Sequence, residues 1–175
     1  NRALATISAH KVAGTFGVLA TAIVAAAKSA ADLGAEYFRL GKQTGLAAES
    51  LSALDIAARN NDTSRENIVT ALRFFQRNLA QAAEGIGEAK NLFTDLGFSS
   101  ADLASSLKNP EDALLKFARR FASIEDVAVK QRVALQLFGR SGYEVIQVLN
   151  DIGTKGIEPF RAKAEAMGLL VSKDM

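Results

Sequence analysis

Residues 135–150 read LQLFGRSGYEVIQVLN, and this stretch decides how the late part of the chain is built. Two glycines flank an Arg-Ser pair between two apolar runs, a pattern that phosphate loops, serine nucleophile turns and joints between helices share. Gly139 follows an apolar helix end, where a left-handed cap residue is expected. Ser141 can cap the next helix, with Glu144 completing a reciprocal capping box. We therefore interpret the stretch as a joint between two helices.

A nucleophilic role for Ser141 does not fit this pattern. The nucleophile turn reads G-x-S-x-G, whereas here the glycine follows the serine directly, as G-R-S-G. A serine nucleophile needs a base, and the single histidine of the chain, His10, belongs to a different predicted helix. A Ser-Lys pair stays open, but no other part of a catalytic constellation accompanies the serine. We predict that the chain has no catalytic residues and is not an enzyme.

Cofactor and metal sites are not predicted either. Gly85 and Gly87 resemble the start of a dinucleotide loop, but Lys90 occupies the third glycine position and no predicted strand precedes the motif. We interpret these glycines as helix breakers. Glu84 and Glu88 lie one turn apart without a second acidic pair, so a two-metal or acid/base pair is disfavoured. The lone histidine lacks the further donors that a metal needs, and cysteine is absent.

The composition favours a helical, globular chain. Of the 175 residues 49% are hydrophobic, enough to bury a core for one domain or one domain with an appendage. Only two prolines and no tryptophan occur, and no alternating apolar and polar run is long enough for a strand. The 21 basic and 19 acidic residues give a net charge of +2, which is weak support for a nucleic-acid partner.

Helix start and stop signals recur along the whole chain and predict an all-α fold. We expect a long N-terminal helix, about Ala3–Leu40 and ended by Gly41, followed by a compact cluster of short amphipathic helices joined at Gly-containing turns. The predicted domains are 1–41, a long hydrophobic helix that continues an upstream helical region, and 42–175, a multi-helix domain. Because the sequence begins with Asn1 rather than Met, we expect a piece of a longer protein.

The cluster begins with a predicted helix at Ala48–Arg59. Thr63 and Glu66 then form a capping box for a helix with one apolar stripe. The stripe residues are Ile68, Leu72, Phe75 and Leu79. The next signals are a helix stop at Gly97, a helix cap at Ser99 or Ser100, and a helix start at Asn109-Pro110-Glu111. Ser123 is then predicted to cap a helix at about Glu125–Phe138. The last two predicted helices are one carrying Val145, Ile146, Leu149 and Ile152, and one at Ile157–Met167 that Gly168 ends.

Two surface features leave other functions open. The sixteen uncharged residues Val12–Ala27 are short, rich in alanine and broken by glycine, so a buried or partner-packed helix is favoured over one that inserts into a membrane. A set of basic residues indicates a solvated face, with an acidic partner or a phosphate backbone as the alternative. The members of this set are Arg73, Arg77, Lys116, Arg119 and Arg120.

Four stretches resemble successive landmarks of the tail tape measure proteins of long-tailed, siphovirus-like bacteriophages and prophages. They are KQTGLAAESLSALDIAAR, ALRFFQRNLAQAAEGIGEAKNLFTDLGFSSADL, ALQLFGRSGYEVIQVLN and AEAMGLLVS. Their order and spacing also match, and the resemblance covers about Leu40–Ser172. The LFGRSG joint is its most specific part.

The resemblance implies a structural virion protein that sets tail length from inside the tail tube and then helps DNA cross the host envelope. The implied partners are the tail tube protein, tail assembly chaperones and tail tip proteins, and a homo-oligomer is left open. The implied locations are the tube lumen in the virion, the host cytoplasm during assembly and, through residues 12–27, the host membrane during ejection. No cofactor is implied. The peptidoglycan-cleaving modules of some family members have no counterpart motif in this chain.

One departure concerns length, because tape measure proteins are far longer than this chain. A single helix of 175 residues would reach only about 260 Å at roughly 1.5 Å per residue. The frequent helix stops predict that the amphipathic helices pack on one another instead. We therefore expect one folded segment of a larger tape measure protein.

Overall fold

The computed structural model describes residues 32–169, and all regular structure in this range is helical, which confirms the predicted all-α fold. A first helix, here named the leading helix, covers residues 32–44. It is followed by α2 (Ala48–Asn60), α3 (Arg65–Ala83), α4 (Gly87–Asp95), α5 (Ser100–Ser106), α6 (Pro110–Ala122), α7 (Val127–Phe138), the 3₁₀ turn η1 (Gly139–Ser141), α8 (Gly142–Lys155) and α9 (Glu158–Ala166).

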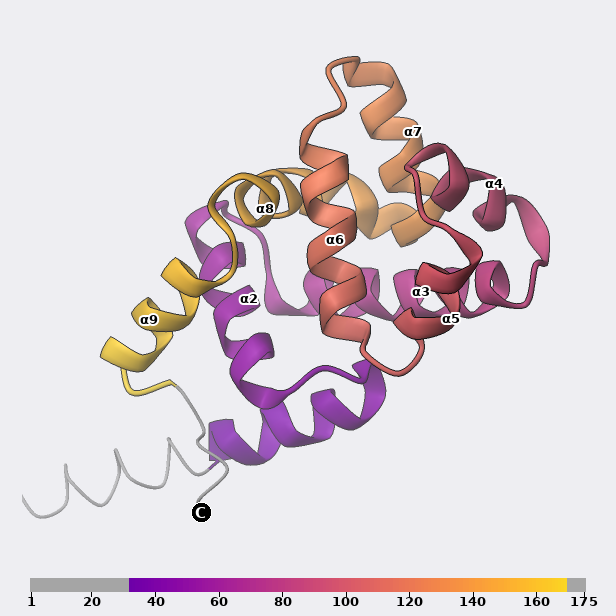
Figure 1. The fold of residues 1–175 in the computed structure, drawn as a ribbon. Helices are drawn as coiled ribbons and strands as arrows, with labels where there is room; N and C mark the ends of the chain where they lie inside the picture. The colour runs from indigo at the N-terminus through magenta and orange to yellow at the C-terminus, as the bar shows by residue number, and fades with distance from the viewer. Residues whose placement is uncertain (1–31, 170–175) are drawn as a thin grey trace, which may run out of the picture.

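The helices are arranged around α3, which runs through the middle of the cluster (Figure 1). Helix α6 crosses in front of it, and α6 and α8 form the most extensive contact between helices. Helices α4 and α7 also pack on α3, whereas α9 packs on α2 at the opposite side. The core therefore lies where α3, α6, α7 and α8 meet.

Phenylalanine rings fill this core. Phe75 of α3 stacks on Phe138 of α7, with ring centroids 5.2 Å apart and planes inclined by 9°. Phe117 of α6 contacts both rings and also Phe93 and Phe121, at centroid distances of 5.2 to 6.2 Å. Each such pair contributes about 0.5–1.5 kcal/mol beyond the burial of its surface. Four helices are thus joined through neighbouring rings, and the apolar stripe predicted for α3 is buried as expected.

Several predicted helix boundaries are confirmed. Ser99 caps α5 and forms a reciprocal capping box with Asp102. Asn109 caps α6, its side chain accepting a hydrogen bond from the Asp112 amide, and Pro110 is the first helical residue. Gly168 has a φ of +67° after α9. These boundaries were predictable because each depends on residues within one turn of the cap.

The predicted end of the first helix at Gly41 is wrong. The helix continues to residue 44, and Gly45, with a φ of +66°, ends it. Gly41 lies inside the helix, and a Cβ there would lie 2.8 Å from the Leu46 carbonyl oxygen, so the glycine is explained by this close approach and not by a helix end. Most of the predicted helix Ala3–Leu40 lies outside the described residues, and the division at residues 41 and 42 stays a prediction.

Two predicted caps are displaced. Ser64, not Thr63, caps α3, and its side chain accepts a hydrogen bond from the backbone N–H of Asn67 at 3.2 Å. The Thr63 hydroxyl instead donates to the Glu144 carbonyl of α8 at 2.8 Å, a tertiary contact that local sequence does not reveal. Similarly, Asp126 caps α7 in place of Ser123, so α7 begins at Val127.

Candidate functional site

The joint between α7 and α8 is confirmed as a helix-to-helix connection, and the chain turns at Gly139. Gly139 has φ +67° and ψ −154°, a backbone conformation open essentially only to glycine rather than the left-handed helical conformation that the sequence predicted. A Cβ at this position would also lie 3.2 Å from the ring of Phe74. The first glycine therefore serves the turn and the close approach of an aromatic ring.

The predicted capping box at Ser141 is wrong. The serine already has helical backbone angles, φ −66° and ψ −10°, and its side chain makes no capping hydrogen bond. An N-cap needs an extended backbone to turn its oxygen toward the amides of the first turn. Here η1 runs directly into α8, so no such position exists between them.

The second glycine of the joint has a packing role that the sequence did not reveal. A Cβ on Gly142 would collide with the carbonyl group of Ala134 in α7. Near the other end of α8, a Cβ on Gly153 would collide with the Ala118 carbonyl of α6 and lie 2.7 Å from the Ala122 Cβ. Helix α8 therefore touches the backbones of two neighbours directly, through one glycine near each end.

The candidate chemical residues do not form a common site in the described part of the chain. Ser141 is half-buried, while Glu84 and Glu88 are exposed around the Gly85–Gly87 break. Residues 32–169 hold no group of three or more His, Asp or Glu side chains that could bind a metal ion. His10 lies outside the described residues. The absence of catalytic, cofactor and metal residues from the chain stays a prediction.

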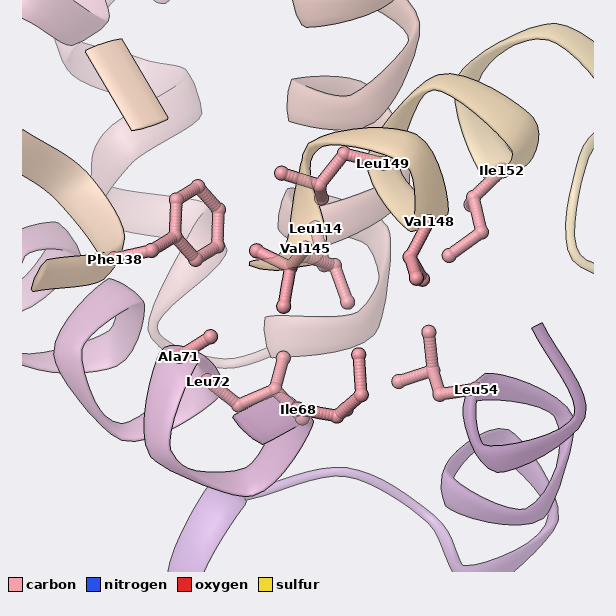
Figure 2. A pocket seen from close by; sticks show the side chains of 10 residues that line it. All are labelled: Leu54, Ile68, Ala71, Leu72, Leu114, Phe138, Val145, Val148, Leu149 and Ile152. Carbon is pink, nitrogen blue, oxygen red and sulfur yellow. The ribbon is translucent and has the colours of Figure 1, made fainter. Parts of the chain in front are cut away.

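A small apolar void lies in the core. Figure 2 shows ten side chains from α2, α3, α6, α7 and α8 pointing toward it, among them Leu54, Leu114 and Val148. Its volume is about 20 Å³, enough for no more than one water, and its lining offers no polar partner. The void is a packing defect between helices and is too small for a cofactor or substrate.

A buried carboxylate joins the leading helix to the cluster. Asp55 of α2 is 3% exposed and accepts hydrogen bonds from Tyr37 Oη at 2.8 Å and from Arg65 at 2.9 Å. Arg59 also contacts Asp55 at 2.9 Å, and Arg65 reaches Glu36 of the leading helix at 3.0 Å. We name these five residues the Asp55 network. None of the five was predicted from the sequence, although a charged residue inside the apolar run LSALDIAA is a signal of a buried polar contact.

The charges of this network are fixed by its geometry. Burial acts to raise the pKa of Asp55, but the hydrogen bonds from Arg65 and Tyr37 outweigh it and hold that pKa below its usual range. Burial and the neighbouring carboxylate raise the pKa of the Tyr37 hydroxyl. Asp55 is therefore ionised and Tyr37 neutral at physiological pH, so the network is an ion pair with a tyrosine donor.

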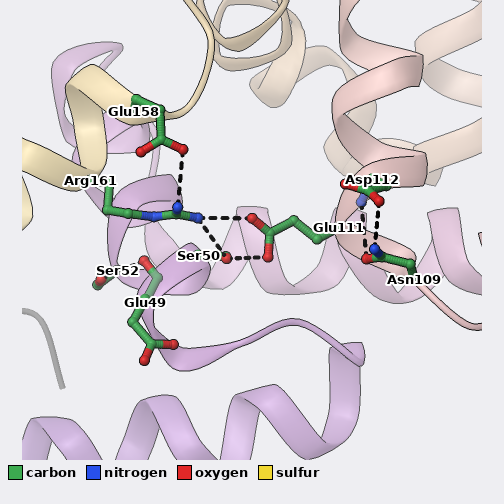
Figure 3. A network of polar contacts seen from close by, with 8 residues as sticks. All are labelled: Glu49, Ser50, Ser52, Asn109, Glu111, Asp112, Glu158 and Arg161. Carbon is green, nitrogen blue, oxygen red and sulfur yellow. Dashed lines mark hydrogen bonds and ion pairs between the residues drawn. The ribbon is translucent and has the colours of Figure 1, made fainter. Parts of the chain in front are cut away.

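A second polar network joins α2, α6 and α9 (Figure 3). Arg161 of α9 donates to Glu111 at 2.9 Å and to Glu158 at 3.0 Å, and the buried Ser50 hydroxyl donates to Glu111 at 2.5 Å. We name these four residues the Arg161 network. Its serine donates to a carboxylate that also binds Arg161, so the network links three helices through one shared carboxylate.

The five basic residues predicted as one surface lie in different surroundings. Lys116 pairs with Asp102, and Arg120 donates to the Leu96 carbonyl, while both lie over the ring of Phe98. Arg119 is exposed. Arg73 and Arg77, on α3, are exposed as well. Two of the five thus fasten α6 to the α4–α5 segment and are not available to an acidic partner.

The membrane prediction concerns Val12–Ala27, which lies outside the described residues. Between residues 32 and 169, no helix combines the length and the apolar character that crossing a bilayer requires.

Comparison with known proteins adds one match. The model of a family described as phage-related minor tail protein matches residues 3–139. This range includes the leading helix and helices α2 to α7, and it stops at Gly139 in the joint. No curated protein and no solved structure shows a significant match to the chain.

Proposed function

We propose, from the premise that this chain belongs to the family of phage-related minor tail proteins, that it is a segment of a tail tape measure protein. As a family member it is a structural component of a phage tail. The finer role is to help set tail length during assembly and to assist DNA delivery through the host envelope. The tube lumen of the virion would be its location, and the tube protein, assembly chaperones and tip proteins its partners.

The observation that carries this proposal is that the family match, over residues 3–139, contains two of the four stretches that resemble tape measure landmarks, at residues 42–59 and 71–103. The LFGRSG joint, at residues 137–142, begins inside the match and extends beyond it. The extensive packing of the helices around α3, α6 and α8 also fits a structural role.

In-frame changes of length in the parent phage test the proposal. We expect deletion of residues 46–169 to shorten the tail and duplication to lengthen it, both measured by electron microscopy of purified virions. A parent carrying Gly142→Ala is the matched control, because it weakens the packing of the segment without changing the number of residues. Tails of unchanged length in both the deletion and the duplication would contradict the ruler role.

A membrane-active protein is the second candidate, favoured by the uncharged run Val12–Ala27. In that case the 175-residue chain should release a dye from liposomes, and Ile23→Asp, within the run, should abolish the release. Ser29→Asp adds the same charge just outside the run and serves as the control. Equal dye release by both variants, or none by the unmodified chain, would remove this candidate.

A further inference from the structure

The leading helix and α3 together expose a cationic surface that belongs to neither polar network. Arg39 and Lys42 lie three residues apart on the exposed side of the leading helix, and Arg73 and Arg77 lie one turn apart on α3. Arg73 donates a hydrogen bond to Gln43, which places the two rows side by side. We name these four cations the basic face.

The charge of the basic face is not neutralised within the described residues. None of the four cations forms an ion pair there, whereas the nearby Glu36 is paired with Arg65. A groove of about 250 Å³ separates the two helices beside Arg73. Its lining consists of Glu36, Leu40, Arg65, Glu66, Val69, Thr70 and Arg73. Glu66 is the one acidic side chain of the groove without a described ion pair.

We propose that the basic face binds the phosphate backbone of DNA. Three of its four cations are arginines, whose planar guanidinium donates two parallel hydrogen bonds to a phosphate. Two rows of cations on neighbouring helices can each follow part of a charged strand, and the contacts would be independent of base sequence. The proposal does not depend on the tail-length role, because it concerns a surface of the isolated chain.

A lipid surface fits the basic face less well. An amphipathic helix binds a membrane by burying its apolar side among the acyl chains. The apolar side of the leading helix, with Leu33, Tyr37 and Leu40, already packs against the core. Phe38 is 61% exposed and Phe74 is half-buried, but cations of the basic face lie over both rings, Lys42 over Phe38 and Arg77 over Phe74, at 4.7 Å in each case.

The test is binding of the 175-residue chain to a fluorescent 20-base-pair duplex of arbitrary sequence, followed by anisotropy between 50 and 200 mM salt. The unmodified chain should bind, and its affinity should fall steeply as salt rises. The double variant Arg73→Gln/Arg77→Gln should bind about tenfold more weakly at low salt. It should also lower the slope of log affinity against log salt by about 1.8, because each lost phosphate contact removes about 0.9.

A matched control separates the basic face from net charge. Arg119→Gln/Arg132→Gln removes two exposed arginines from α6 and α7 and should leave binding unchanged. The double variant Arg39→Gln/Lys42→Gln, on the leading helix, should weaken DNA binding as the α3 variant does. Because the two variants change different helices, a folding defect in one of them does not decide the outcome. Circular dichroism melts identify any such defect.

Three results would overturn the proposal. The first is the absence of duplex binding at 50 mM salt. The second is an equal loss of affinity in the control variant, which would assign binding to net charge alone. The third is binding to vesicles containing phosphatidylserine, without duplex binding and with the same dependence on Arg73 and Arg77, which would assign the face to a lipid surface.

Discussion

The centre and the periphery of the molecule are held together by different means. At the centre, α8 meets the backbones of α7 and α6 at Gly142 and Gly153, and phenylalanine rings join four helices. At the periphery, the leading helix and α9 also bury apolar side chains, such as Tyr37 and Phe160, but each is in addition joined to α2 by a polar network. Interlocked apolar contacts form cooperatively, whereas a charge network can be removed by one substitution or one proton. The periphery should therefore separate from the centre first.

The largest expected effect comes from removing α8 and α9. The family match ends at Gly139, but Val145, Val148, Leu149 and Ile152 of α8 are core residues. A chain ending at residue 139 lacks α8, so the apolar surfaces of α6 and α7 that pack on α8 would be exposed to water. We therefore expect this shorter chain to lack a cooperative thermal transition. A chain of residues 1–169 should keep the transition. Cooperative melting of the shorter chain would show that the centre does not need α8.

Gly142→Ala should destabilise the fold by about 3 kcal/mol or more, because the added methyl group meets backbone atoms of Ala134 that cannot move independently. Urea denaturation followed by circular dichroism measures the change. Ser141→Ala, one residue earlier and without a capping hydrogen bond, should change stability by less than about 0.5 kcal/mol. Similar midpoints for the two variants would mean that the helices do not cross as closely as described.

Asp55→Asn tests the periphery and should lower stability by about 2–3 kcal/mol, because Arg65 loses its buried counter-ion. Amide hydrogen exchange should accelerate most in the leading helix, residues 32–44, and least in α6 and α8. Lys155→Gln, which removes an exposed pair with Asp151, is the control and should have an effect below about 1 kcal/mol. Uniform acceleration across all helices would contradict a separable periphery.

The pH dependence has a defined sign. Because the pKa of Asp55 is lowered in the folded state, its contribution is complete above the unfolded pKa, about 4, and is lost as the pH falls through the folded pKa. The raised pKa of Tyr37 acts at the other end, where stability is lost as the pH rises above about 10. Unfolding free energies at pH 6 and pH 3 should differ less in Asp55→Asn than in the unmodified chain, by on the order of 1 kcal/mol. An identical difference in both chains would exclude Asp55 as the acid-sensitive group.

The smallest effect is expected at the other polar network. Arg161→Gln should cost about 1 kcal/mol or less, because both partners of the Arg161–Glu111 pair are partly exposed to water. Hydrogen exchange should show the loss in α9 alone. A loss of stability as large as that of Asp55→Asn would contradict this expectation. It would mean that the half-buried Arg161–Glu111 pair stabilises the fold as much as the buried Asp55–Arg65 pair does.

Local signals predicted much of this fold, and tertiary contacts account for the errors. Gly168 and the Ser99 and Asn109 caps depend on one turn of chain, and each was predicted correctly. Thr63 was misread because its hydroxyl contacts α8, 81 residues away. The packing role of Gly142 could not be predicted, because it requires knowing which backbone passes beside it. Of the candidate basic surface, the sequence identified the two α3 arginines but not the row contributed by the leading helix.

The shared dependence of both outer helices on α2 has a mechanical consequence. Tyr37 near the start of the described chain and Arg161 near its end both contact α2, so the two ends of the folded segment lie on the same side of the molecule (Figure 1). Inside a longer filament, the folded segment would span only a short distance, so the tail-length change expected on its deletion or duplication requires the segment to be extended within the tube. Under tension, the two outer helices would separate from the cluster first. The distance between the two ends of the segment would then increase while the centre stays folded.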